Sequence, residues 1–242
     1  MNSFNTHASV SRPVAALAAL AAVLALLVVG PRAFALTPGP TIIRQCPGCT
    51  NTLAQFTIGS GNLLRAEFWT DGFRRAPMSP MLPALVKCPH CQKLFWIEDA
   101  KKLAQRMGSR DEGDPWRNAK EPLEPVESEY LVAAEAANIS RARELYARQR
   151  AWWLANDPAR GDPKQKAEWT EARKKNLNRL AALLDESKER ELIAKAEIAR
   201  ELGEFDRCLQ LLGRPLDKQW ADTANLVARL AREKQQQVAK LP

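Results

Sequence analysis

Histidine is scarce in this chain of 242 residues, which contains only two and none after His90. Histidine is the usual base that activates a serine or cysteine nucleophile, so the chain beyond His90 lacks that kind of catalytic pair. The sequence also contains no glycine-rich phosphate-binding loop. These absences favour a protein that is not an enzyme, and we expect no catalytic residue and no organic cofactor.

Positive charge is also in modest supply. Lysine and arginine total 36 against 28 acidic residues, which leaves a net charge of +8. A nucleic-acid-binding protein is expected to concentrate its basic residues on one face. The cations nearest the cysteines are scattered and are interpreted as a solvated surface: Arg74, Arg75, Lys101 and Lys102. The charge therefore does not favour a nucleic-acid partner.

An uninterrupted apolar run covers residues 14–30. Pro31 follows the run, and Ala33-Phe34-Ala35 matches the A-x-A cleavage pattern of secretory signal peptides. Residues 1–35 are therefore predicted to be a signal peptide, and the chain to be exported to the periplasm or the extracellular space. The alternative is a retained membrane anchor, since a run of this length is barely enough to cross a bilayer. Residues 14–30 would then be the only membrane contact.

Four of the five cysteines form two C-x-x-C pairs, Cys46-Pro47-Gly48-Cys49 and Cys88-Pro89-His90-Cys91. Four thiolates in one region are typical of a structural zinc site, because tetrahedral Zn²⁺ takes four sulfur ligands at about 2.3 Å. We predict that Cys46, Cys49, Cys88 and Cys91 bind one structural zinc ion per chain. The prolines preset the turns, and Gly48 permits an unusual backbone angle.

Short strands are predicted around both cysteine pairs. Residues 41–45 lead into the first pair, residues 84–87 lead into the second, and residues 94–97 leave it. A hairpin is predicted from residues 55–58 and 63–69, a further turn at Asp71-Gly72, and a short helix over 98–109. The aromatic residues of these strands are predicted to form the core rather than to stack on bases: Phe68, Trp69, Phe95 and Trp96.

The sequences CPGC and CPHC, on either side of a β segment, resemble the zinc-ribbon family over residues 41–97. The resemblance implies a structural zinc ion with all four positions filled and none open to activate water. Thr50 and Gln92 stand where zinc ribbons often have glycine. His90 is a superfluous ligand in this arrangement and is expected to be an exposed turn residue. A β unit this small has a thin core, so the metal would supply much of its folding energy.

The sequence Cys88-Pro89-His90-Cys91 also matches the active-site motif of periplasmic thiol oxidants with the thioredoxin fold. There, a helix N-terminus and a nearby imidazole keep the first cysteine as a thiolate. The strand-like residues 94–97 after the motif disfavour this interpretation, and it leaves the first C-x-x-C unexplained. Export favours it, since an oxidising compartment promotes disulfides. Two structural disulfides are the third possibility for these cysteines.

The chain after residue 128 is predicted to be helical. Residues 109–128 carry three prolines and many charges and are predicted to be a linker between two domains. Helices are expected over 129–156 with a break near 138–140, then 164–185 with Asp162 as its N-cap, 188–202, 204–212 and 218–238. The predicted fold class is α+β, with a small β-rich zinc ribbon over 36–108 and an all-α bundle over 129–242.

Within this bundle, residues 196–213 (AEIARELGEFDRCLQLLG) resemble one tetratricopeptide repeat, with a helical hairpin over 188–213. The resemblance places Gly203 at the turn, Phe205 in the groove and Cys208 at a small-residue position, where it is expected to be a buried structural thiol. Together with the cysteine motifs, the chain resembles uncharacterised bacterial proteins with a zinc ribbon and a helical half. That likeness implies a fold and no activity.

The favoured function is a non-enzymatic structural-zinc protein that acts as a protein–protein interaction or scaffold module, with a protein or peptide as its partner. One alternative is an exported thiol–disulfide oxidoreductase that uses Cys88 and Cys91. The other is a zinc-ribbon nucleic-acid binder, which the charge distribution does not favour. Thiol chemistry separates the first two, and the cellular compartment separates the third from both.

Overall fold

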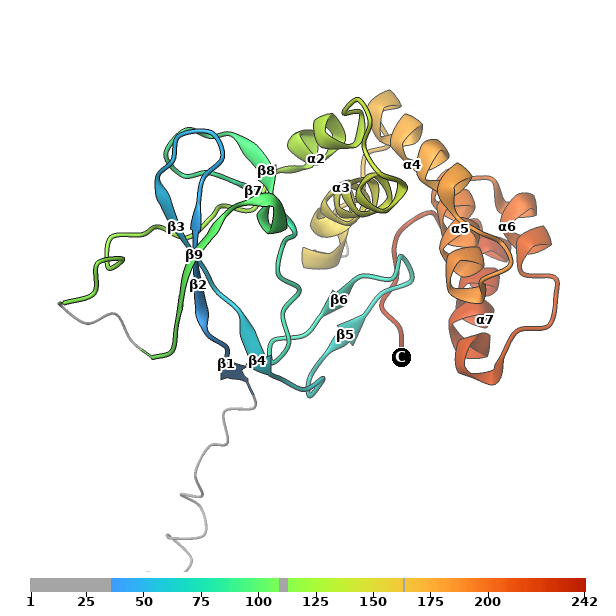
Figure 1. Ribbon diagram of the computed structural model, residues 1–242. Helices are drawn as coiled ribbons and strands as arrows, with labels where there is room; N and C mark the ends of the chain where they lie inside the picture. The colour runs from blue at the N-terminus through green and yellow to red at the C-terminus, as the bar shows by residue number, and fades with distance from the viewer. Residues whose placement is uncertain (1–35, 109–112, 163) are drawn as a thin grey trace, which may run out of the picture. The chain divides into compact units, whose positions relative to one another are not determined.

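Small antiparallel sheets make up the N-terminal part of the protein and six α-helices the C-terminal part, in the α+β class predicted from sequence (Figure 1). The computed structural model describes residues 36–108, 113–162 and 164–242, and residues 36–242 cluster as one compact unit. The predicted signal peptide or membrane anchor lies outside the described residues. Within the described ranges, no helix has the length and apolar character needed to cross a membrane.

The largest sheet has three antiparallel strands in the order β3-β2-β9. Its members are β2 (Thr41–Gln45), β3 (Thr52–Gln55) and β9 (Lys102–Arg106). The predicted helix over 98–109 is wrong, since a short 3₁₀ turn, η1 (Ile97–Asp99), is followed there by β9. The open edge of β2 pairs with this segment, and Leu103 and Ala104 pack against the core around Ile43.

The remaining strands form three two-stranded pairs. They are β1 (Thr37–Pro38) with β4 (Ile58–Ser60), β5 (Glu67–Phe68) with β6 (Arg74–Arg75), and β7 (Leu85–Lys87) with β8 (Leu94–Trp96). The β7–β8 pair confirms the strands predicted around the second cysteine motif. The predicted hairpin of residues 55–58 with 63–69 is wrong, because these segments pair with other partners.

The turn predicted at Asp71-Gly72 is confirmed and joins β5 to β6. Gly72 has a φ of +77°, a conformation that a residue without Cβ adopts readily. The Asp71 carboxylate accepts a hydrogen bond of 3.1 Å from the backbone N–H of Phe73. This local side-chain bond closes the turn.

The helices are α2 (Glu127–Ala134), α3 (Arg141–Gly161), α4 (Glu171–Leu183), α5 (Glu189–Glu201), α6 (Phe205–Leu211) and α7 (Lys218–Arg232). The predicted break near 138–140 is confirmed: Asn138 has a φ of +61°, and the Ser140 side chain caps α3. The predicted end of this helix at Asn156 is wrong, because α3 continues through Pro158. Likewise, α4 begins after Thr170 rather than after Asp162, and Pro163 lies outside the described residues.

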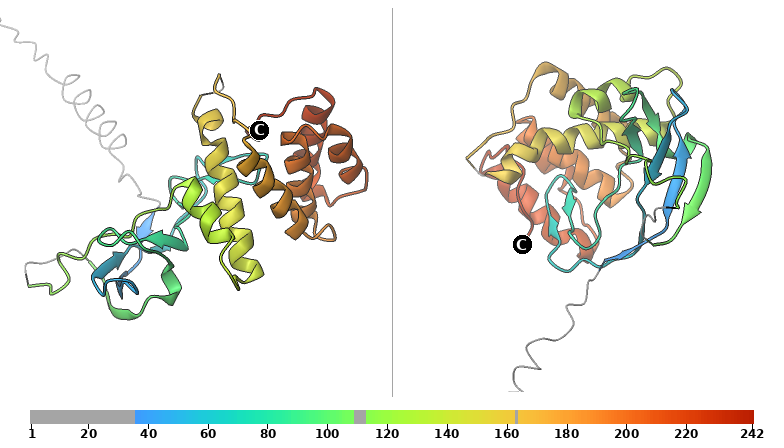
Figure 2. Two further views of the ribbon diagram at one scale, coloured as in Figure 1. Left: turned by 90° about the horizontal axis from the view of Figure 1, so that it is seen from above. Right: turned by 90° about the vertical axis from the view of Figure 1, so that its left-hand side faces the viewer.

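Helices α5, α6 and α7 pack together around one apolar cluster (Figure 2). Gly203, with a φ of +83°, makes the predicted turn between α5 and α6. Cys208 is fully buried in this cluster, which confirms the expected structural thiol. Helix α7 ends at Arg232, earlier than the predicted residue 238, because the chain then returns to the β part. There Thr70 donates to the carbonyl of Ala239 and Leu241 donates to that of Phe68.

The described part of the predicted linker, residues 113–128, runs against the β part and leads into α2. Ala119 is 2% exposed and packs beside Ile43 and Ala54. Leu123 exchanges two backbone hydrogen bonds of 2.9 Å with Lys87, next to the second cysteine motif. These contacts hold the segment along the two hairpins that carry the cysteines.

Candidate metal centre

Each cysteine pair forms the turn of a β hairpin, β2–β3 for the first and β7–β8 for the second. The two turns share one backbone pattern: the first cysteine donates to the carbonyl five residues later and accepts from the N–H four residues later. The bonds are Cys46 to Asn51 at 2.9 Å and Thr50 to Cys46 at 3.0 Å, and Cys88 to Lys93 at 3.0 Å and Gln92 to Cys88 at 2.9 Å. The same local geometry thus presents two sulfurs from each hairpin.

The four sulfurs meet at one point. The Sγ atoms of Cys46, Cys49, Cys88 and Cys91 all lie within 4.8 Å of one another. The Cys46–Cys91 and Cys49–Cys88 sulfurs are each 3.7 Å apart. A tetrahedral ion with metal–sulfur bonds of about 2.3 Å requires sulfurs about 3.8 Å apart. The spacing and the thiol chemistry therefore fit coordination of one metal ion by these four residues.

One side of the cysteine cluster is covered by a small apolar core. Cys46 and Cys88 are 1% and 0% exposed, whereas Cys49 is half-buried and Cys91 is exposed. The buried pair packs with side chains from both hairpins and η1: Leu53, Val86, Phe95 and Ile97. The ligands are thus held from the inside by apolar packing, and the cluster opens to solvent on the side of Cys91.

Several N–H groups point at the sulfurs. The backbone N–H of Gly48 lies 3.3 Å from the Cys46 sulfur, and that of His90 lies 3.4 Å from the Cys88 sulfur. The side-chain amide of Asn51 donates to the Cys49 sulfur at 3.3 Å. Such bonds stabilise the thiolate form that a metal requires. The role of Asn51 was not predicted, although a polar side chain two residues after a ligand cysteine is a usable signal.

Before any metal binds, these surroundings give the thiols different pKa values. Hydrogen bonds from the side chain and backbone of Asn51 lower the pKa of Cys49 to about 6. Burial raises the pKa of Cys88 to about 12, although the backbone N–H groups of Cys91 and His90 act in the opposite direction. Cys49 is therefore ready to ligate near neutral pH, whereas Cys88 must release a proton when metal binds.

Left-handed backbone occurs in both turns, but not at Gly48. Gly48 could adopt a positive φ but does not do so here. Its lack of a side chain matters for space, since a Cβ there would lie 2.6 Å from Lys93 Cδ and 3.3 Å from Cys91 Sγ. The positive φ angles belong to Thr50 at +62° and Gln92 at +60°. These are the positions where zinc ribbons often have glycine.

The surroundings of Cys88 differ from those of a thiol oxidant. Such enzymes lower the pKa of the first cysteine at a helix N-terminus. Here the motif is the turn between β7 and β8, and the first cysteine is fully buried with a raised pKa. The five cysteines, all in the described part of the chain, are free thiols. The geometry favours metal ligation by Cys88 over attack on a disulfide.

The other residues singled out from sequence divide between core and surface. Phe95 is 6% exposed and belongs to the core beside the cysteines, as predicted. Phe68 is 41% exposed, so its assignment to the core is wrong. The side chain of His90 is exposed, as expected for a turn residue. Trp96 is half-buried and packs edge-on against Tyr146 of α3 at 5.6 Å, which links the second hairpin to the helices.

No protein-family model matches the chain, and comparisons with curated proteins and with solved structures found no significant match. The likeness to zinc ribbons and to a tetratricopeptide repeat therefore rests on the motifs of this sequence. The structure contributes four clustered cysteines able to hold a metal ion and a mostly helical C-terminal part.

Proposed function

We propose that this chain is a non-enzymatic protein that holds one structural zinc ion and acts as a protein–protein interaction or scaffold module. The observation that carries the proposal is the convergence of four sulfurs from the turns of two hairpins that belong to separate sheets. A metal ion at this point would cross-link the two hairpins. It would therefore stabilise a β part whose own apolar core is small.

Zinc is the metal that this donor set favours. Four thiolates at tetrahedral spacing suit Zn²⁺, which has no geometric preference of its own and exchanges no electrons. With four cysteines bound, the ion has no free position at which a water molecule could be activated. This supports a structural role over a catalytic one, and the zinc-ribbon interpretation over the oxidoreductase alternative.

The interaction role is supported by an apolar cleft between β6 and α3, lined by Phe73, Trp153 and Leu154, where a partner's side chains could be buried. Clefts of this kind are the usual binding sites of proteins. The helical hairpin of α5 and α6, with its resemblance to a tetratricopeptide repeat, would belong to the same scaffold. We further propose that the chain is exported, or else anchored by residues 14–30, on the strength of its apolar run and Ala33-Phe34-Ala35.

The first test is zinc content together with free-thiol titration, on protein isolated from its native compartment without added reductant. We expect one zinc ion per chain, with the four ligand thiols reacting only after chelation and Cys208 only after unfolding. A metal-free protein with a readily reduced Cys88–Cys91 disulfide would instead establish the oxidoreductase alternative. Cross-linking of the full chain in the same compartment tests the interaction role, which a chain that cross-links to no protein would contradict.

A further inference from the structure

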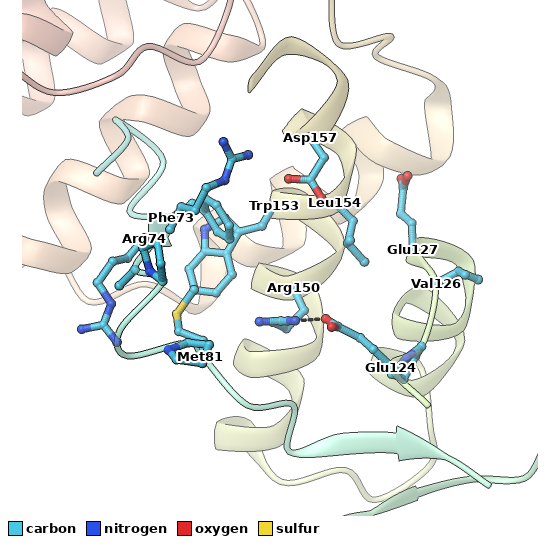
Figure 3. A pocket seen from close by; sticks show the side chains of 15 residues that line it. Phe73, Arg74, Met81, Glu124, Val126, Glu127, Arg150, Trp153, Leu154 and Asp157 are labelled. Atoms are coloured by element: carbon cyan, nitrogen blue, oxygen red, sulfur yellow. Dashed lines mark hydrogen bonds and ion pairs between the residues drawn. The ribbon is translucent and has the colours of Figure 1, made fainter. Parts of the chain in front are cut away.

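A cavity of about 630 Å³ lies between β6, the segment that follows it, the residues before α2, and helix α3 (Figure 3). Its walls are mainly apolar and include Phe73, Met81, Trp153 and Leu154. Phe73 and Trp153 meet edge to face with ring centroids 5.7 Å apart. Binding pockets commonly have volumes of roughly 300–1,000 Å³ and combine apolar walls with a few polar groups. This cavity has the size and lining of a ligand site.

Arg150 is the polar group that distinguishes the cavity. Its side chain is 9% exposed, and its guanidinium carbon lies 5.7 Å from the ring of Tyr130 and 5.8 Å from that of Trp153. Burial lowers the pKa of Arg150, although the charge of Asp157 acts in the opposite direction. Figure 3 shows Arg150 reaching from α3 to Glu124, which it contacts through Nη2. Its buried Nε has no hydrogen-bond partner among the described residues.

Two other arginines of this chain show what a complete ion pair looks like. Arg173 binds Glu127 through both Nε and Nη2, each at 2.7 Å from a carboxylate oxygen. Arg200 binds Glu197 through the same two nitrogens. Such two-bond pairs are stronger and more specific than single contacts. Glu124 contacts Arg150 through Nη2 alone and leaves Nε without a partner in the ranges that the structure describes. Its own side chain is 45% exposed, so a second carboxylate could displace it at a small cost in free energy.

The other charges around the cavity leave room for an anion. Glu127 and Asp157 also line it, but they are bound to Arg173 and Arg160. Arg74 contributes a second buried Nε that has no partner in the described parts of the chain. An incoming carboxylate would therefore meet the under-used guanidinium group of Arg150, with Glu124 as its competitor.

We propose that this cavity binds the C-terminal carboxylate of a partner peptide whose last residue is apolar. The carboxylate would take Nε and Nη2 of Arg150 in place of Glu124, and the apolar side chain would pack against Trp153 and Leu154. In the last residue of a peptide, the free carboxylate and the side chain are attached to the same Cα. This arrangement matches the cavity, in which the Arg150 guanidinium lies beside the apolar wall. This inference rests on the proposed interaction function and names the chemistry of the partner.

Fluorescence anisotropy of labelled hexapeptides against the full zinc-loaded chain tests this inference. The probe is a mixed-sequence pool that ends in Phe or Leu, prepared with a free C-terminal carboxylate and with a C-terminal amide. We expect the free acid to bind at least about tenfold more tightly than the amide, because the amide cannot pair with Arg150. Equal affinities, or no binding of either pool, would overturn the inference. N-acetylphenylalanine serves as competitor. If it displaces the labelled peptide at concentrations as low as those at which the peptide itself binds, the ligand is a free organic acid instead.

Three variants test whether Arg150 and Glu124 determine the affinity for the free acid. Glu124→Gln removes the competing carboxylate and should tighten binding of the free acid about threefold or more. Arg150→Gln should weaken it about tenfold, and Arg179→Gln, the same change at a 55% exposed arginine that does not line the cavity, should leave it unchanged. If Arg150→Gln does not fold, Glu124→Gln decides, since unchanged or weaker binding there contradicts the proposal. Zinc content and cross-linking are measured separately, so a failure here is distinguishable from failure of the proposed function.

Discussion

Asp71, in the turn between β5 and β6, and Arg160, near the end of α3, form an ion pair in which both side chains are completely buried. The same Asp71 carboxylate accepts a hydrogen bond of 3.0 Å from the Asn156 side chain. The indole N–H of Trp153 donates to the Asp71 carbonyl at 3.0 Å. Three residues of one helix therefore hold a turn that lies far from them in the sequence, and the hairpin is attached to the helical part through buried polar contacts.

Removing one member of this ion pair should strongly destabilise the protein. We expect Asp71→Asn and Arg160→Met each to lower the free energy of unfolding by about 3–5 kcal/mol, because each variant removes the fully buried partner of a buried charged group. In Asp71→Asn the only carboxylate left to Arg160 among the described residues is Asp157, whose side chain is 46% exposed. Denaturant unfolding followed by tryptophan fluorescence measures this change. The control is Arg75→Met, since Arg75 pairs with Glu67 at the surface and should cost less than about 1 kcal/mol. A loss at Asp71 no larger than that of the control would contradict the assignment.

Glu201 should make stability fall as the pH rises. It is fully buried, accepts hydrogen bonds from Trp152 at 2.7 Å and Asn156 at 3.0 Å, and has its pKa raised well above 4.5 by burial and by the nearby Glu197 and Asp71. The folded state therefore retains a proton that the unfolded state releases. The contribution of this group is complete below the unfolded pKa and is lost as the pH rises through the folded pKa.

The variant Glu201→Gln tests whether ionisation of Glu201 lowers the free energy of unfolding as the pH rises. It keeps an acceptor oxygen for Trp152 and Asn156 and cannot ionise. Its free energy of unfolding, relative to the natural protein, should increase from about pH 4.5 upward, by at most about 1.4 kcal/mol per pH unit. Unfolding curves at a series of pH values provide the measurement. Parallel pH profiles for the two proteins would show that Glu201 does not hold the proton.

Glycine should be favourable at the two left-handed positions of the metal centre. Such a conformation costs about 1–2 kcal/mol for a residue with a Cβ. We expect Thr50→Gly and Gln92→Gly to raise the stability of the metal-loaded protein by up to about 1 kcal/mol each, offset in part by the entropy of the unfolded glycine. Each variant also loses one side-chain bond, from the Thr50 hydroxyl to the Cys49 carbonyl at 2.7 Å or from the Gln92 amide to the Pro89 carbonyl at 3.3 Å. The Thr50 bond is the shorter one, so Thr50→Gly gains less.

The matched control for Gln92→Gly is Gln105→Gly, which places the same substitution in strand β9. Glycine inside a strand is destabilising, so this variant should be less stable than the natural protein. Thermal unfolding of the zinc-loaded proteins compares them. Destabilisation of similar size in both glutamine variants would mean that Gln92 gains no relief of strain.

Loss of a ligand cysteine should unfold the β part and spare the helices. Cys46→Ser and Cys88→Ser each remove one of the four proposed ligands, so residues 41–97 would lose the metal ion that we propose stabilises their small core. Helices α5, α6 and α7 have an apolar cluster of their own and should keep their circular dichroism signal. Zinc analysis and limited proteolysis of residues 41–97 provide the measurement, and chelation of the natural protein should have the same effect.

Cys208→Ala is the control for these cysteine variants, because Cys208 lies in the α6 core and outside the metal centre. It should keep its full zinc content and lose about 1 kcal/mol of stability through a small cavity. A ligand variant that keeps both its zinc and its resistance to proteolysis would contradict the structural role of the metal.

Much of the metal centre could be predicted from the sequence, because its signals are local. The two C-x-x-C motifs identified the four clustered thiols, and the flanking apolar residues indicated the strands of the two hairpins. The turn at Gly203 and the helix break near Asn138 were likewise predicted, since the backbone conformations there depend on adjacent residues. Asn51 was missed because its bond to the Cys49 sulfur depends on how the turn closes.

The sequence by itself determined which four cysteines could hold a metal ion and the helical character of the C-terminal part. Only the tertiary structure decided that residues 102–106 form a strand beside β2, that α3 passes through Pro158, and that the chain after Arg232 returns to β5. The physical reason is that these segments have weak or contrary local preferences and obtain their stability from distant partners. Two further features depend on tertiary structure in the same way: the buried ion pair of Asp71 with Arg160, and the Nε of Arg150, unpartnered in the described chain. Each exists only when segments far apart in the sequence meet.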